Sequence, residues 1–304
     1  MNTQLLNRID SIIEKSKKYV PSEDKIPKGY TSQHGPKGGI YYDTSTKNTF
    51  KSLIEKILEI DYNALISGKR KTPENASKEI EKIRVESIGK ENHYFNYQLF
   101  GEWIEGQVFN ILGMRILAYR MLHQKVPLDK MKDFLEAVTH KEMSESEFKN
   151  VFDLARAVSG VDDDQAFLSL GITRPNKVEL LEKEKAFTEK VTKQLFGDTI
   201  ILYRGIYGEP AKEIRAGLEK NGQYEIEELS LSSYSQDPIA AYGQVFKRDP
   251  NFIVIQREVK AEDILSAWYA NNVYLDIMPN QKEVLVLNRK DKFTVTKKDV
   301  LFQQ

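Results

Sequence analysis

Residues 198–206 read DTIILYRGI and begin the series of segments that decides the fold. Runs of Ile, Val, Leu and Tyr like this one are typical of β-strands. Further runs of the same kind are YEIEELSLSSYS at 224–235, NFIVIQREV at 251–259, EVLVLNR at 283–289 and KFTVTKKDVLF at 292–302. Two segments with helical spacing, at 209–221 and 237–246, lie between them. The C-terminal part of the chain is therefore predicted to be rich in strands.

The region before Gly197 is predicted to be helical, because apolar residues recur at i, i+3 and i+4 from about Phe50 to Gln194. Pro73 is placed for the first turn of a helix, and Ser144 with the following acidic residues predicts a capped helix start. Helices followed by strands indicate the α+β fold class. The expected helices span 50–66, 76–88, 100–124, 128–141, 144–159 and 176–196.

Composition excludes several classes of chemistry. The chain has 304 residues, 45 Lys and Arg, 45 Asp and Glu, and no Cys. Without Cys there is no disulfide, thiolate nucleophile or Cys-ligated metal. The four His are scattered along the sequence, which argues against a His-rich metal centre, so we expect no metal. Zero net charge argues against binding to nucleic acid or membrane by bulk electrostatics alone.

The most apolar stretch, from Leu99 to Leu122, does not predict a membrane span. It contains Glu102, Glu105, Arg115 and Arg120, and a membrane-spanning helix would not normally carry four charges. The N-terminal residues have helical apolar spacing at 5–13 but no signal-peptide core. We therefore expect a cytoplasmic protein with no membrane partner.

Charge is unevenly distributed along the chain. Residues 1–92 carry 17 Lys and Arg against 13 Asp and Glu, a net of +4 that the remainder cancels. Within this part, GYTSQH and IYYDTS predict a hairpin around the turn His34-Gly35-Pro36-Lys37-Gly38-Gly39. One interpretation is a solvated hairpin, and the other is a basic docking surface for nucleic acid or a partner. The tyrosines of that surface would be Tyr30, Tyr41 and Tyr42.

Polar residues interrupt the β-like segments at several places. Tyr203-Arg204-Gly205 ends an apolar strand, where a buried Arg needs an anionic partner and Gly permits close approach of a ligand. The alternative is an Arg paired with a local carboxylate. Ser233-Tyr234-Ser235 precedes Gln-Asp-Pro, which predicts a helix start with Asp237 as N-cap. No His follows to build a Ser-His-Asp triad, and cap or turn serines are the plainer interpretation.

Gln281 and Glu283 stand at the start of the strand EVLVL. In strand geometry they would point to the same side, about 6–7 Å apart. A carboxylate beside an amide suits stabilisation of a cation and orientation of an acceptor. The alternative is two surface residues on an edge strand.

Together these segments resemble the R-S-E class of mono-ADP-ribosyltransferases, the group that includes the bacterial ADP-ribosylating toxins. That family has an aromatic-Arg-Gly, a Ser-x-Ser followed by a helix, and a Glu/Gln-x-Glu on successive strands. The resemblance is clear over 198–302 and implies a helical N-terminal part followed by a mixed β-sandwich of the toxin type. We expect an ADP-ribosyltransferase domain at 91–304 and a mildly basic helical and hairpin accessory region at 1–90.

The resemblance implies NAD as substrate and transfer of ADP-ribose through an oxocarbenium-like step. Glu283 would stabilise that cation and bind the ribose 2′-hydroxyl. Arg204 would hold the phosphate and ribose region of NAD, and Ser233 would hydrogen-bond Glu283 or the ribose.

The same resemblance extends the NAD site to neighbouring residues. Gly205 would offer its backbone to the nicotinamide carboxamide, and Tyr242 would stack on nicotinamide. The motifs also bring Tyr203 and Ser235 into the NAD-binding set. No metal is required by this chemistry.

The identity of the acceptor depends on Gln281. In this family a Glu at that position goes with arginine acceptors, whereas Gln-x-Glu occurs in the Rho-modifying exoenzymes, which act on asparagine, and in pierisin-like toxins, which act on guanine in DNA. We therefore expect a non-arginine acceptor. The loop at 267–274 corresponds to the acceptor-recognition loop, where Trp268, Tyr269 and Tyr274 either contact the acceptor or anchor the core.

Several functions remain open from the sequence. The acceptor is a protein side chain or an RNA or DNA base, and an NAD glycohydrolase or a catalytically inactive binding module are the alternatives. Similar proteins include phage-encoded transferases, secreted effectors and intracellular toxins of antitoxin or phage-defence systems. We expect an intracellular toxin or effector, and such a toxin would need an antitoxin-like inhibitor as partner.

Overall fold

The computed structural model describes residues 17–20, 33–34, 40–43, 73–106, 108–158, 176–246, 249–290 and 292–303. The chain divides into two compact units, Met1–Ile60 and Asp61–Gln304. This boundary lies earlier than the one expected at residue 90. The reason is that helix α4 (Pro73–Ile88) packs against elements of the second unit, among them α5 (Lys90–Ile104) and α10 (Lys177–Phe196).

In the first unit, β3 (Ile40–Asp43) pairs antiparallel with β1 (Lys17–Val20) and with β2 (Gln33–His34). Gln33 lies opposite Tyr41, and His34 lies opposite Ile40, so β2 and β3 form the predicted hairpin. The helix expected at 50–66, the helical spacing at 5–13 and the side chains of the proposed docking surface lie outside the described residues.

The described helices of the second unit begin close to where their caps predict. α4 begins at Pro73, as expected. α8 (Glu145–Val158) begins after Ser144, whose Oγ accepts from the Glu147 backbone N at 3.3 Å while the Glu147 carboxylate accepts from the Ser144 backbone N at 2.9 Å. This reciprocal pair satisfies amide groups that a helix start leaves free. The other helices before the sheet are α6 (Val108–Met121) and α7 (Leu128–Thr139).

The single helix expected at 100–124 is wrong, because the chain forms α5 and α6 there. α5 ends at Ile104, and Gly106 has a φ of 74°. Glycine adopts this left-handed conformation readily, whereas a helix interior does not allow it. The break redirects the chain, so that Trp103 on α5 and Arg115 on α6 both reach the region described below as the candidate site.

The strands of the second unit form a six-stranded sheet in the order β11-β7-β4-β6-β9-β8 and a separate pair, β10-β5. Every pairing described is antiparallel, so the expected mixed sheet is corrected to an antiparallel one. The strand bounds are β4 Thr199–Tyr207, β5 Gln223–Glu227, β6 Leu231–Ser235, β7 Phe252–Lys260, β8 Ile264–Ala267, β9 Glu283–Leu287, β10 Lys292–Thr296 and β11 Val300–Gln303.

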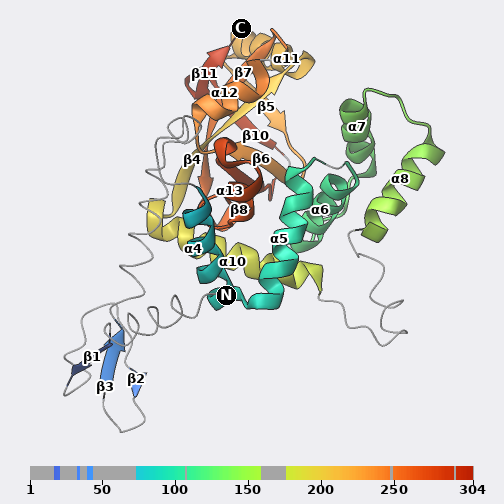
Figure 1. The fold of residues 1–304 in the computed structure, drawn as a ribbon. Helices are drawn as coiled ribbons and strands as arrows, with labels where there is room; N and C mark the ends of the chain where they lie inside the picture. The colour runs from blue at the N-terminus through green and yellow to red at the C-terminus, as the bar shows by residue number, and fades with distance from the viewer. Residues whose placement is uncertain are drawn as a thin grey trace. The chain divides into compact units, whose positions relative to one another are not determined.

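Helices cover opposite faces of β7. α11 (Glu209–Asn221) places Ile214 in a cluster with Ile255, and α12 (Pro238–Phe246) places Ala241 in a cluster with Val254. This alternation follows from the two-residue period of a strand. Figure 1 shows α11 and α12 beside β7 and β11, and α4, α5 and α10 beside β8 and α13 (Val273–Ile277).

A buried ion pair joins α4 to the rest of the second unit. Arg84 on α4 and Glu184 on α10 are fully buried, with Arg84 Nη2 2.6 Å from Glu184 Oε2. Glu184 also accepts from Ser266 and Asn271, so its charge is surrounded by donors, as a buried carboxylate requires. The fold class is thus α+β, with α4 as part of the larger unit.

Among the residues that the structure describes, no helix is long and apolar enough to cross a membrane.

Candidate active site

The three sequence motifs lie on adjacent strands of the six-stranded sheet. β6 stands between β4, which carries Arg204, and β9, which begins with Glu283. In the register, Tyr203 lies opposite Ser235, and Ser235 lies opposite Glu283. Residues far apart in sequence are therefore level with one another across three strands.

Glu283 is a buried carboxylate that is held through one oxygen. Its side chain belongs to a residue only 7% exposed, and its Oε1 accepts from Ser233 Oγ at 2.6 Å. The same oxygen accepts from the indole Nε1 of Trp103 at 3.1 Å. Within the described part of the chain, no donor is bonded to Oε2. The carboxylate is thus fixed on one side and open on the other.

Both donors on Glu283 are neutral. Burial raises the pKa of Glu283, and the hydrogen bonds from Ser233 and Trp103 act in the opposite direction. Burial also raises the pKa of the nearby Tyr274 phenol, and the negative charge of Glu283 adds to that effect. Within the described ranges no cation is bonded to Glu283, so its charge is available to a positive centre.

Arg204 is anchored by a buried glutamate. It forms an ion pair with Glu228, whose side chain is 2% exposed. Glu228 also accepts from Arg257 Nη1 at 3.1 Å and from the Tyr234 hydroxyl at 2.9 Å. Asn288 Oδ1 accepts a further bond from Arg257 at 3.0 Å. The alternative expected from sequence, an Arg paired with a carboxylate, is thus present, and 30% of the Arg204 side chain remains exposed.

Arg115 on α6 is a site residue that the sequence analysis missed. Its Nε donates to the Leu231 carbonyl at 3.3 Å, and its guanidinium lies 3.8 Å from the ring centroid of Phe134. Its Nη1 is buried and has no hydrogen-bond partner among the residues that the structure describes. Burial, and next the charge of Arg204, lowers the pKa of Arg115 to about 9. An unpaired cation beside another cation is the arrangement expected where an anion binds.

Arg115 also connects the two halves of the site. Its guanidinium carbon lies 5.9 Å from the ring centroid of Trp103, the residue that holds Glu283. The only sequence signal for this role was an Arg inside an apolar helical run, which we used to argue against a membrane span.

The sheet is split between β4 and β6. β4 pairs with β7 from Thr199 to Tyr207, but its register with β6 consists of one pair, Tyr203 opposite Ser235. Beyond that pair, the edge of β4 that carries Arg204 and Gly205 is not covered by β6. A divergence of this kind gives a ligand access to strand backbone.

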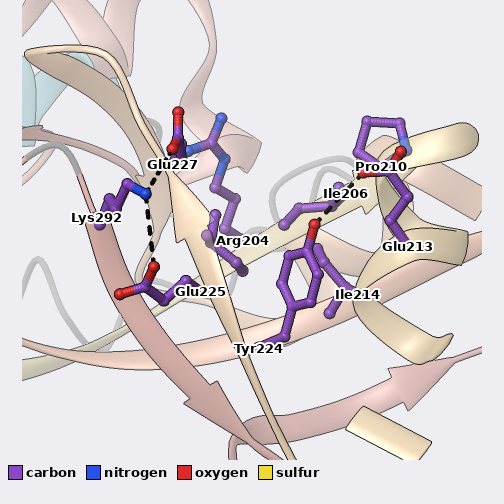
Figure 2. A pocket seen from close by; sticks show the side chains of 10 residues that line it. Arg204, Ile206, Pro210, Glu213, Ile214, Tyr224, Glu225, Glu227 and Lys292 are labelled. Atoms are coloured by element: carbon purple, nitrogen blue, oxygen red, sulfur yellow. Dashed lines mark hydrogen bonds and ion pairs between the residues drawn. The ribbon is translucent and has the colours of Figure 1, made fainter. Parts of the chain in front are cut away.

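Arg204 also lines a cavity of about 550 Å³ between β4, α11 and the β5–β10 pair. Figure 2 shows the Tyr224 hydroxyl directed toward Glu213 and the Lys292 ammonium between Glu225 and Glu227. The walls are partly apolar, as is usual for organic ligands. The apolar lining residues are Ile206, Pro210, Ile214, Tyr224 and Ile226.

The expectation that Gln281 and Glu283 share a strand face is wrong. Gln281 lies in the 3₁₀ turn Pro279–Gln281, and Lys282 has a φ of 45°, so regular strand geometry begins only at Glu283. The Gln281 Nε2 donates to Met278 Sδ at 2.7 Å. The backbone carbonyl of Gln281 accepts a hydrogen bond from Ser235 Oγ at 2.7 Å, so Ser235 stabilises the turn that contains Gln281.

The two tyrosines of the expected NAD-binding set, Tyr203 and Tyr242, pack against an apolar cluster. Tyr203 and Tyr242 both pack against the cluster that contains Phe252, and the Tyr242 ring lies 5.4 Å from the Phe252 ring. Gly205 lies in β4 opposite Val254 of β7, with its strand edge at the split. Asp237 is the expected N-cap of α12, since it accepts from the Ile239 backbone N at 2.9 Å.

The aromatic residues proposed to recognise the acceptor are core side chains. Trp268, Tyr269 and Tyr274 are each at most 2% exposed. Trp268 Nε1 donates to the Gln236 side chain at 2.9 Å, and the Tyr269 hydroxyl lies 3.0 Å from Thr192 Oγ1. Of the two interpretations left open by the sequence, the structure matches core anchors.

In the described ranges, no group of three or more His, Asp or Glu side chains is placed to hold a metal ion. Comparison of the chain with protein-family models, with curated proteins and with solved structures finds no match.

Proposed function

We propose that the protein is an NAD-dependent mono-ADP-ribosyltransferase that transfers ADP-ribose to a non-arginine acceptor. One arrangement carries the proposal. The buried carboxylate of Glu283 is held through Oε1 by Ser233, two strands away from an arginine, Arg204, that lies at a split in the sheet.

The proposed chemistry matches the state of Glu283. In NAD, the bond between the nicotinamide nitrogen and ribose C1′ breaks, and its electron pair leaves with nicotinamide. The ribose becomes oxocarbenium-like. A carboxylate bonded only to neutral donors keeps its negative charge for that cation, and the open Oε2 is free to accept from the ribose 2′-hydroxyl. The acceptor nucleophile then bonds to C1′, and its proton passes to solvent water.

The arginines suit the pyrophosphate of NAD. Arg204 and Arg257 share Glu228, and Arg115 adds a guanidinium with a buried, unpartnered Nη1. Burial, and to a lesser extent repulsion from a neighbouring arginine, lowers the pKa values of Arg115 and Arg204, and an anion placed there would offset the repulsion. The cavity lined by Arg204 has room and apolar walls for the adenosine half (Figure 2).

Gln281 supports a non-arginine acceptor. Its amide cannot take up a guanidinium proton, but it can hydrogen-bond an amide or a nucleobase. If the protein labels arginine or simple guanidine analogues efficiently, this part of the proposal is wrong.

NAD glycohydrolysis is the second candidate function, and one observation favours it. The aromatic residues expected to contact an acceptor are buried, which leaves water as the acceptor that needs no recognition surface. Modification of an RNA or DNA base was expected to use those rings and the basic first segment with Tyr30, Tyr41 and Tyr42, whose side chains lie outside the described residues, so it stays a prediction.

The test is incubation with labelled NAD and, separately, cell protein, RNA and DNA. The labelled fraction identifies the acceptor class, and free ADP-ribose alone indicates a glycohydrolase. Glu283→Gln is compared with Glu258→Gln, an exposed carboxylate on β7. We expect nicotinamide release to fall about 100-fold or more in the first variant only. Equal rates in the two variants would refute the catalytic role of Glu283.

A further inference from the structure

The position of Trp103 is fixed by the helix that precedes the site. Phe100 is fully buried, and its ring packs 6.3 Å from that of Tyr274 on α13. Trp103 follows three residues later, so it lies on the same face of α5. α5 ends one residue after it, at Ile104. The docking of α5 on α13 therefore directs the Trp103 ring toward the first residue of β9.

A tryptophan at this position does more than fill space. A buried ring could be supplied by Phe, whereas a buried indole N–H needs an acceptor. Here the acceptor is Glu283 Oε1, at 3.1 Å, which also receives the Ser233 hydroxyl. Two donors from different elements on one oxygen fix the rotation of the carboxylate and leave Oε2 as the oxygen that faces a ligand.

We propose that Trp103 is a positioning residue for Glu283, whose indole N–H keeps the carboxylate ionised and oriented with Oε2 toward the reacting ribose. The inference rests on the proposed function for its catalytic consequence. The Trp103–Glu283 contact itself does not depend on that function, and it can be tested separately by the pH dependence of Trp103 fluorescence.

Two ionisable groups near Glu283, Tyr274 and Arg115, do not titrate in the acid range. Tyr274 faces it from α13, and burial raises the pKa of that phenol well above its usual value. Arg115 lies over the Trp103 ring from α6, and its pKa is lowered only to about 9. Lys282, the preceding residue, is 3.2 Å from Asp237. An acid limb of the pH profile that disappears in Glu283→Gln is therefore assigned to Glu283.

The first experiment compares Trp103→Phe with Trp268→Phe in the full chain. Trp268 is the matched control, because it is also a buried indole whose N–H has an acceptor, the Gln236 side chain at 2.9 Å. In Trp103→Phe we expect kcat for nicotinamide release to fall about tenfold, with the KM for NAD nearly unchanged. We also expect the acid limb to move up by about one pH unit, the size of a lost hydrogen bond to a charged group.

In Trp268→Phe we expect the acid limb to stay where it is in the native protein. A limb that moves equally in both variants, or in neither, would overturn the proposal.

The second experiment needs no catalysis and keeps Trp103 in place. The chain has two Trp, so Trp268→Phe leaves Trp103 as the sole indole fluorophore. Its fluorescence is followed against pH in this variant and in the double variant that adds Glu283→Gln. We expect a titration in the first that is lost in the second. Indistinguishable profiles would overturn the proposal. If the native chain releases no nicotinamide, the proposed function fails, and this titration alone decides whether Trp103 senses Glu283.

Discussion

Replacing Glu228 tests whether this buried carboxylate stabilises the two arginines that it contacts. Its side chain is 2% exposed and accepts from Arg204, from Arg257 and, through both oxygens, from the Tyr234 hydroxyl. In Glu228→Gln the length and volume are retained but the negative charge is lost. The new amide NH₂ then faces groups that are themselves donors, and two guanidinium groups lose their shared counter-ion.

The size of the expected change in the free energy of unfolding follows from the burial of Glu228. Removing one partner of a buried ion pair typically costs about 3–5 kcal/mol, because it leaves an uncompensated charge. Arg204 and Arg257 keep side-chain exposures of 30% and 22%, so water offsets part of this. We therefore expect the free energy of unfolding to fall by about 3 kcal/mol, the lower end of the usual range.

Glu227→Gln is the matched control, because the same change is made one residue earlier. Glu227 is 50% exposed and pairs with Lys292 at 2.9 Å and Lys130 at 3.2 Å. Exposed ion pairs contribute little, so the free energy of unfolding should hardly change. The assay is urea unfolding followed by tryptophan fluorescence, since Trp103 and Trp268 both lie in the Asp61–Gln304 unit. If the free energy of unfolding falls no more in Glu228→Gln than in Glu227→Gln, the reasoning is refuted.

The remaining predictions concern two helix glycines, Glu283 and Arg115. Gly217→Ala should lower the free energy of unfolding by about 1–3 kcal/mol, because the added Cβ would lie 2.2 Å from the Tyr224 ring. At Gly243 an added Cβ would meet no other described part of the chain within 4 Å, so Gly243→Ala should raise the free energy of unfolding by about 0.5–1 kcal/mol. Thermal unfolding compares the two alanine variants, and equal effects would contradict the prediction. The ionised form of Glu283 is lost as pH falls through its raised pKa, so the pH profile of nicotinamide release should have an acid limb above 4.5, and a limb at or below 4.5 would contradict this. Arg115→Lys should weaken NAD binding about tenfold by calorimetry, through loss of one charge-assisted hydrogen bond, and an unchanged Kd would exclude Arg115 from the site.

Local signals in the sequence located most elements of the second unit. Pro73, Ser144 and Asp237 mark helix starts in the structure as they did in the sequence, because caps and first turns act over a few residues. The helix expected at 100–124 was wrong because apolar periodicity continues on both sides of Gly106, and only the backbone angle of that glycine reveals the break. The span 224–235 similarly reads as one β-like run but folds as β5 and β6.

Only the candidate-site residues that belong to short sequence motifs could be predicted from the sequence. Arg204, Ser233 and Glu283 stand out in the sequence because polar residues interrupt strands. Trp103 and Glu228 do not, since their roles depend on contacts across 180 residues to Glu283 and across 24 to Arg204. The sequence also could not predict that the loop aromatics are buried, because a Trp or Tyr in a loop has the same local sequence pattern whether it contacts a ligand or packs in the core.

The separation of charges gives Glu228 and Glu283 different roles in the proposed mechanism. If Arg204 were paired with Glu283, the carboxylate charge would already be neutralised and could contribute little to a developing cation. Glu228 instead takes up the arginines, while Glu283 is bonded only to the neutral donors of Ser233 and Trp103. The consequence is the raised pKa of Glu283, which is the cost of an unpaired charge in a buried place. A cation formed beside Glu283 would offset this unfavourable energy, so in the proposed reaction the carboxylate would interact more strongly with the transition state than with the ground state, and that difference would accelerate the reaction.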